Sequence, residues 1–233
     1  MTHAKNSAHQ KIVMKKEFSP NFTAEEINVE FLVIHYSACD LAETLRIFHD
    51  KARGVCTHFI VDTNGDLYDL GGDQPFLTSP ILRAAHAGTS HFTLGETRYE
   101  SLNKLSIGVE LVNLNGNLIE FPEPQIQSLY QLTLALKNRF SILQDPNRVV
   151  GHEHIAGFRG KVDPGRLFNW KTFFQNTYPG LEAPLRKAVL NDELWSEFLT
   201  TVTDLGPIDG EFTQWSKLSA RLESFVGKQF QAK

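Results

Sequence analysis

Two almost uninterrupted apolar runs constrain the fold of this chain more than any other feature. They read VEFLVIHY at residues 29–36 and LSIGVELV at residues 105–112. Both are short and rich in β-branched or aromatic residues, as is typical of strands that are buried on both faces of a sheet. Such strands need layers on either side, so the two runs predict a central sheet with helices packed on it.

Turn and capping residues place further elements around these runs. Asp40, followed three residues later by Glu43, forms a capping-box pattern that predicts a helix over 41–52. An Asn-Gly pair separates two strand-like segments, 57–62 and 66–70, and is a strong signal for a hairpin. The chain therefore continues from the first strand through a helix into a β-hairpin.

The middle of the chain completes the predicted sheet. Residues 71–104 are polar and contain two prolines, so we expect an irregular loop, and loops of this length are usually functional. Pro122 and Pro124 open a helix with one apolar face, and a further strand is expected over 148–151. This order of elements predicts an α/β fold with a mixed central β-sheet flanked by helices.

Composition divides the chain into three expected parts. Residues 1–20 are predicted to be a flexible N-terminal arm, and residues 21–180 the main domain. Within 181–233, two amphipathic patterns predict a helical hairpin, one over 190–202 and one after Gly206-Pro207. We expect its apolar face to be buried on the main domain or on a partner.

Charge and composition exclude several classes of function. The 23 basic and 27 acidic residues give a net charge of −4, which argues against a nucleic-acid binder that neutralises phosphates. No apolar run reaches the roughly 18 residues that a membrane-spanning helix needs. Residues 1–18 lack the apolar core of a secretory signal, so we expect either a cytoplasmic protein or an envelope protein whose leader is missing here.

Histidines are concentrated where predicted loops meet predicted strands. Five of the nine lie at such places: His35, His58, His86, His152 and His154. One histidine there is most often a hydrogen-bonded structural residue, but loops at strand ends are also where sites form. A catalytic zinc needs three protein ligands and a position for water. His35, His152 and Asp163 are therefore candidates, although Asp163 could instead cap the turn at Pro164-Gly165.

Three further residues each allow a structural and a functional interpretation. Glu110 interrupts an apolar strand, so it is either an edge-strand residue facing water or a general base acting on a water molecule. Lys161 is either a solvated loop lysine or a cation that stabilises an oxyanion. Cys56 has His58 nearby, but two residues of one strand face the same side without facing each other. A cysteine nucleophile is therefore disfavoured, and the two cysteines form no disulfide framework.

Five segments, in order, resemble one known family. They are VIHYSA at 33–38, THFIVDTNGDLYDL at 57–70, AAHAG at 84–88, SIGVELVN at 106–113 and VVGHEHIAGFRGKVDPGRLFNW at 149–170. Together they resemble the type 2 zinc-dependent N-acetylmuramoyl-L-alanine amidases, relatives of the peptidoglycan recognition proteins. The resemblance covers residues 29 to about 178, and five segments in the same order are far more specific than one.

The resemblance implies an amidase/peptidoglycan recognition protein-like fold and a zinc hydrolase. The enzyme would cleave the amide between N-acetylmuramic acid and L-alanine in peptidoglycan or muropeptides, which would be its partners. By the match of motifs, Zn²⁺ would be bound by His35, His152 and Asp163. Glu110 and Lys161 match the catalytic residues of the family.

Other matches and departures leave the surroundings of this site open. His86, in the HAG motif, is expected to contact substrate or to contact a metal ligand on the side away from the metal. We expect the same of His58 and His154. His154 stands where the family commonly has an acidic residue, and Gly157 stands where it commonly has a proline. The competing interpretation is a peptidoglycan-binding module of the same fold that does not cleave. All three candidate ligands are present, which favours the enzyme.

Overall fold

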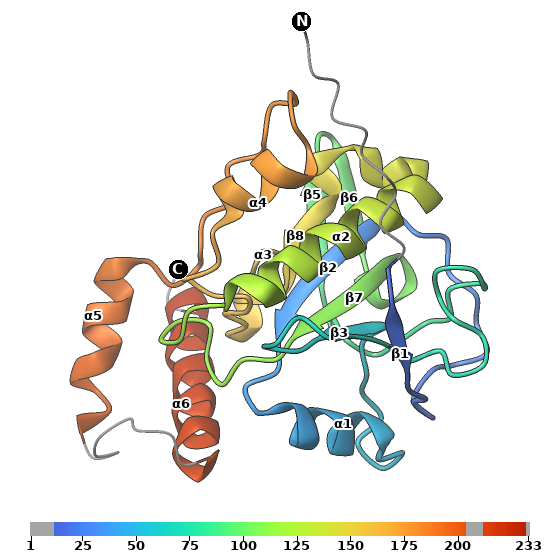
Figure 1. Ribbon diagram of the computed structural model, residues 1–233. Coiled ribbons are helices and arrows are strands. Elements are labelled where there is room, and N and C mark those ends of the chain that lie inside the picture. Colours follow the sequence, from blue (N-terminus) through green and yellow to red (C-terminus); the bar gives the residue numbers. More distant parts are fainter. Residues whose placement is uncertain (1–11, 204–211, 232–233) are drawn as a thin grey trace, which may run out of the picture.

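A six-stranded mixed sheet forms the centre of the molecule (Figure 1). The fold is that of a computed structural model, which describes residues 12–203 and 212–231. Across the sheet the strands are β1 (Met14–Lys16), β4 (Leu67–Asp69), β3 (Phe59–Val61), β7 (Ser106–Leu111), β2 (Phe31–Tyr36) and β8 (Val149–Gly151). The β3–β4 pair is antiparallel and the other neighbours are parallel, so the predicted mixed sheet is confirmed.

One face of the sheet is covered by helices α2 (Glu123–Arg139) and α4 (Trp170–Thr177). Two short 3-10 turns, η2 (Ser141–Gln144) and η3 (Pro146–Arg148), lead from α2 to β8. Leu32 and Ile34 of β2 lie in the same buried cluster as Leu129 of α2. The apolar face predicted for the helix after Pro122 therefore forms the main core.

The opposite face of the sheet carries α1 (Leu41–His49), α3 (His152–Ala156) and a hairpin of β5 (His91–Leu94) and β6 (Thr97–Glu100). Successive side chains of a strand point to opposite faces. Leu32 and Ile34 face α2, so His35 must emerge on the opposite face with Phe31 and Val33. The same alternation in β7 sends Glu110 to that face.

Two segments differ from the sequence-based expectation. The hairpin of β5 and β6 lies inside the expected irregular loop 71–104, followed by the 3-10 turn η1 (Leu102–Lys104). Its strands are mostly polar and only partly buried, so no apolar run marked them. Residues 14–16 of the expected arm form the edge strand β1, which is held by pairing with β4. Residues 1–11 lie outside the described part of the chain.

The two predicted C-terminal helices are present as α5 (Asp192–Thr200) and α6 (Phe212–Gln231). Trp195 of α5 and Leu222 of α6 share a buried cluster with Val162 of the main domain. The helical pair thus buries its apolar face on the main domain, next to the 3-10 turn η4 (Gly157–Arg159). Among the described residues, no helix has the length and apolar character needed to cross a membrane.

Candidate active site

Three neighbouring parallel strands bring the candidate residues to one edge of the sheet. His35, near the end of β2, is in register with Glu110 of β7. His152 follows directly after β8, which pairs with β2 on its other side. Parallel strands end at the same edge, where the sites of such sheets commonly lie. The register therefore explains why residues so distant in sequence meet.

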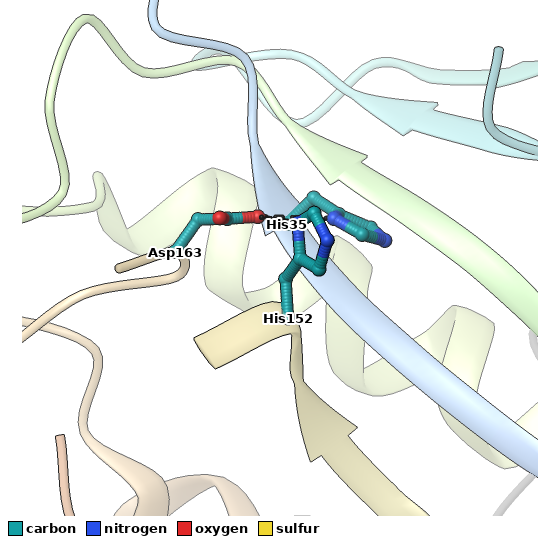
Figure 2. A group of neighbouring side chains, drawn as sticks. All are labelled: His35, His152 and Asp163. Atoms are coloured by element: carbon teal, nitrogen blue, oxygen red, sulfur yellow. Dashed lines mark hydrogen bonds and ion pairs between the residues drawn. The ribbon is translucent and has the colours of Figure 1, made fainter. Parts of the chain in front are cut away.

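His35, His152 and Asp163 converge in a buried cluster (Figure 2). Oδ2 of Asp163 lies 3.0 Å from Nδ1 of His35 and 3.0 Å from Nδ1 of His152. One potential ligand atom from each residue lies within 4.8 Å of the others. The structure thus brings together the three residues that the sequence singled out as ligands.

A chain of hydrogen bonds fixes the protons on the His35 side of the cluster. The Ser106 hydroxyl donates to the Leu102 carbonyl at 2.6 Å, so both Ser106 oxygens can only accept from Nε2 of His86, at 3.2 Å. Nε2 of His86 therefore carries the proton, and Nδ1 of His86 accepts from Nε2 of His35 at 3.0 Å. Burial lowers the pKa of His35 to about 4. His35 is consequently neutral near pH 7, and its Nδ1 is the ring nitrogen directed at Asp163.

The same reasoning applies to His152. Its Nε2 faces the Ala87 carbonyl at 3.3 Å and donates to it, so Nδ1 is the ring nitrogen directed at Asp163. Burial by itself raises the pKa of Asp163, but His152 and His35 hold that pKa well below its ordinary value, so this carboxyl is ionised.

Nδ1 of His35, Nδ1 of His152 and Oδ2 of Asp163 therefore converge, and this arrangement suits a bound cation. Two imidazole nitrogens and one carboxylate oxygen are the donor set of a catalytic zinc. Each imidazole also donates its other N–H group, to His86 or to the Ala87 carbonyl, as ligating histidines usually do. The residues fit zinc by this chemistry.

Glu110 lines the same pocket and is almost fully buried. It sits in a central strand, between β3 and β2, so the alternative of a water-facing edge residue is wrong. Burial raises its pKa to about 8, the charge of Asp163 adds to this effect, and Lys161 opposes it. A carboxyl group that titrates near neutral pH is suited to take up and release a proton.

Lys161 also lines the pocket and is not a freely solvated lysine. Its Nζ lies 2.7 Å from Oε1 of Glu223, which is carried by α6. The pocket has a volume of about 380 Å³. Glu223, Ser219 and Arg159 line it as well, and sequence reasoning missed all three. No local motif marks them, because two of them reach the site only through the packing of α6.

His58 and His154 lie outside this pocket. Nδ1 of His58 accepts from the Gly108 N–H group at 2.9 Å, and its Nε2 faces the Leu82 carbonyl at 2.8 Å. Nδ1 of His154 accepts from the Gly151 N–H group at 2.8 Å, and its Nε2 faces the Lys187 carbonyl at 3.2 Å. Both rings use their two nitrogens to hold backbone. The expectation that they contact substrate or support a metal ligand stays a prediction.

Cys56 borders the pocket, yet the structure gives no support to a cysteine nucleophile. Burial raises the pKa of its thiol to about 11, so the reactive thiolate is scarce at neutral pH. Both nitrogens of its neighbour His58 are bonded to backbone groups. Cys39 is buried and free as well.

Comparison with known proteins now decides the family. The family model described as N-acetylmuramoyl-L-alanine amidase matches residues 25–166, more than half of the chain. The chain belongs to the N-acetylmuramoyl-L-alanine amidase family. It is an enzyme, an amidase acting on peptidoglycan, and the resemblance seen in its sequence motifs is confirmed.

Solved structures agree with this assignment. A selenomethionine derivative of AmpD is 25% identical, with a TM-score of 0.56 over 70% of this chain and 93% of that one. AmiD from E. coli, in complex with anhydro-N-acetylmuramic acid-L-Ala-D-γ-Glu-L-Lys, is 31% identical, with a TM-score of 0.53 over 66% of this chain and 59% of that one.

AmpDh3 from Pseudomonas aeruginosa, at 20% identity and a TM-score of 0.54, matches in fold over 99% of both chains. The likeness in fold therefore includes the C-terminal helices. A search of curated protein sequences gives no match.

Proposed function

We propose that this amidase is zinc-dependent and cleaves the amide joining the lactyl group of N-acetylmuramic acid to L-alanine of the stem peptide. The observation that carries the proposal is the convergence of His35, His152 and Asp163 in the pocket, where one potential ligand atom from each lies within 4.8 Å of the others. The AmiD structure holds a muropeptide with this linkage, which supports the choice of substrate.

His35, His152 and Asp163 would hold the metal. Zinc, when bound, lowers the pKa of a coordinated water to about 7 and polarises a carbonyl group. Behind the ligands, His86 keeps the Nε2 proton of His35 engaged, so that the Nδ1 lone pair stays directed into the site. The cluster is buried, which strengthens every charge interaction within it.

Glu110 is the proposed general base. Its carboxylate takes a proton from the attacking water and later delivers it to the nitrogen of the leaving L-alanine. Its register with His35 on the neighbouring strand supports this role, and it does not belong to the cluster of His35, His152 and Asp163. Lys161 supplies a positive charge at the pocket wall for the oxyanion that forms when the amide carbonyl is attacked.

The direct test is digestion of purified muropeptides by the zinc-loaded and the chelator-treated enzyme, with released stem peptide measured by mass spectrometry. We expect free stem peptide that begins with L-alanine, released only when metal is present. Tight binding of intact muropeptide, with no peptide released by the zinc-loaded protein, would instead identify a recognition module. Parallel digestion of anhydro-muropeptides and whole sacculi compares recycling with wall cleavage.

A further inference from the structure

Helix α6 is docked directly on the loop that carries Lys161. Gly160 has a φ of +88°, and a Cβ atom added there would lie 2.0 Å from the carbonyl oxygen of Glu223. Gly160 thus permits backbone to approach backbone, which a side chain would prevent. On the other side of Lys161, Val162 is buried in one cluster with Leu222 and Val226 of α6. The loop residues around Lys161 are therefore fixed by contacts to this helix.

The same helix reaches into the pocket with two polar residues. Ser219 and Glu223, one helical turn apart, line the pocket together with Glu110 and the three ligand candidates. Oε1 of Glu223 lies 2.7 Å from Nζ of Lys161, and the side chains are 40% and 24% exposed. An ion pair as exposed as this contributes little to stability. Its location in the pocket points to a role in the reaction.

A lysine that must stabilise an oxyanion benefits from restraint. Its four-carbon stem has many rotamers, so holding it in one conformation costs conformational entropy. Lys161 lies between η4 and the ligand Asp163, outside any regular helix or strand. Glu223 accepts one of the three N–H groups of the Lys161 ammonium, which leaves two for the substrate.

We propose that Glu223 is a positioning residue that holds the Lys161 ammonium at the edge of the pocket, so that α6 is part of the active site. This inference rests on the proposed function, in which Lys161 faces the developing oxyanion. It predicts the direction in which removal of Glu223 changes turnover. A carboxylate that merely neutralised Lys161 would slow turnover, and its removal would speed the enzyme, whereas removal of a positioning group slows it.

A double-mutant cycle tests this inference through turnover. We expect Glu223→Ala to lower kcat roughly 10-fold with KM changed less than about 2-fold, because an interaction used mainly in the transition state is lost. In a Lys161→Met background the same substitution should have no further effect on kcat. Glu223→Gln, which keeps an accepting oxygen, should restore part of the loss. Glu197→Ala in α5, on an exposed residue outside the pocket lining, is the matched control.

Either of two results overturns the proposal: a higher kcat for Glu223→Ala, or an equal loss of kcat in the Lys161→Met background. Thermal unfolding and zinc content of each variant, measured alongside, show whether the fold and the metal site are intact. An unstable Glu223→Ala protein is replaced by Glu223→Gln in the same cycle. Absence of peptide release by the wild-type enzyme contradicts the proposed function itself, and the next measurement then tests the contact independently.

That measurement follows the Lys161 ammonium directly in metal-free protein. With ¹⁵N-labelled lysine, NMR relaxation reports the motion of each ammonium group, and the Lys161 signal is assigned by its loss in Lys161→Met. We expect restricted motion in the wild-type protein. In Glu223→Ala the motion should rise to that of the exposed Lys217 on the same helix. Equal motion of Lys161 in both proteins would show that Glu223 does not hold it.

Discussion

At the residue scale, the site depends on which ring nitrogens carry protons. His86 does not face Asp163, yet it determines what His35 presents there, because it accepts the Nε2 proton of His35 at 3.0 Å. The sequence could mark His86 through the HAG motif but could not assign this role. The assignment depends on Ser106 and the Leu102 carbonyl, which lie in another part of the chain. The motifs identify the residues, whereas the protonation of each ring depends on hydrogen bonds that form only in the folded chain.

His86→Ala should therefore weaken zinc binding by about 10- to 100-fold, the usual cost of removing a partner behind a ligand. Without an acceptor for its Nε2 proton, the neutral His35 ring can adopt the other tautomer and lose the Nδ1 lone pair as a donor. Competition with a chromophoric chelator measures the zinc dissociation constant. His49→Ala, at an exposed histidine that does not itself line the pocket, is the control. Unchanged zinc affinity in His86→Ala would contradict the role given to this residue.

Glu110→Gln should separate chemistry from metal binding. The amide cannot accept a proton, so we expect turnover to fall at least about 100-fold. Zinc content should stay at the wild-type level, because Glu110 does not belong to the ligand cluster. Steady-state release of stem peptide and metal analysis of the same preparations check both statements. Unchanged turnover would rule out Glu110 as the base.

The raised pKa of Glu110 also predicts how stability depends on pH. Burial raises this pKa from its ordinary value of 4.5 to about 8. Between those values the folded protein keeps a proton that the unfolded chain has released, so this group lowers the free energy of unfolding as pH rises. The slope approaches about 1.4 kcal/mol per pH unit. In metal-free Glu110→Gln this part of the pH dependence should be absent.

Urea unfolding of chelator-treated proteins at about pH 5 and about pH 8 measures this effect across the relevant window. The wild-type protein should lose more stability between the two pH values than Glu110→Gln does. Equal losses would show that Glu110 ionises in the folded protein as readily as in the unfolded chain. This cost of burying a base is a case of stability given up for function.

At the scale of elements, the predictable parts of the fold are those with a strong local pattern. The runs at 29–36 and 105–112 contain β2 and β7, and they were predictable because strands buried on both faces have almost continuously apolar sequences. The hairpin of β5 and β6 and the edge strand β1 have no such apolar run. Their polar residues are held by pairing with a neighbour, a contact that a local window of sequence does not contain.

Gly160 tests the packing of α6 on the active-site loop. Gly160→Ala places a Cβ atom 2.0 Å from the Glu223 carbonyl, at a φ of +88°, and must move the helix or the loop. Gly54→Ala meets nothing within 4 Å at a φ of +63°, so it carries the backbone strain alone, on the order of 1 kcal/mol. We expect Gly160→Ala to be clearly less stable than Gly54→Ala and to show faster hydrogen exchange in α6. Equal stability of the two variants would contradict the close packing.

At the scale of the whole molecule, the pocket of the candidate active site extends beyond the segment that identifies the family. The family match ends at residue 166, whereas Ser219 and Glu223 lie well beyond it and still line the pocket. The sequence predicted that the C-terminal helices bury an apolar face on the main domain or on a partner, and it did not decide between the two. A helical pattern shows that a face is apolar but does not identify the surface on which that face packs. The structure shows that α5 and α6 pack on Val162, next to the candidate ligand Asp163.

This packing predicts that the C-terminal helices and the main domain unfold together. Leu222 of α6 is fully buried in the cluster that contains Val162, so Leu222→Ala should cost about 2–5 kcal/mol. Leu199→Ala, at a partly exposed position of α5, should change stability by less than about 1 kcal/mol. Calorimetry should show one transition, shifted down as a whole in Leu222→Ala. A new low-temperature transition with the main midpoint unchanged would mean that α5 and α6 form an independent unit. Val162 lies between Lys161 and Asp163 in the chain. A shared transition would therefore also mean that residues 161–163 lose their packing when α6 unfolds.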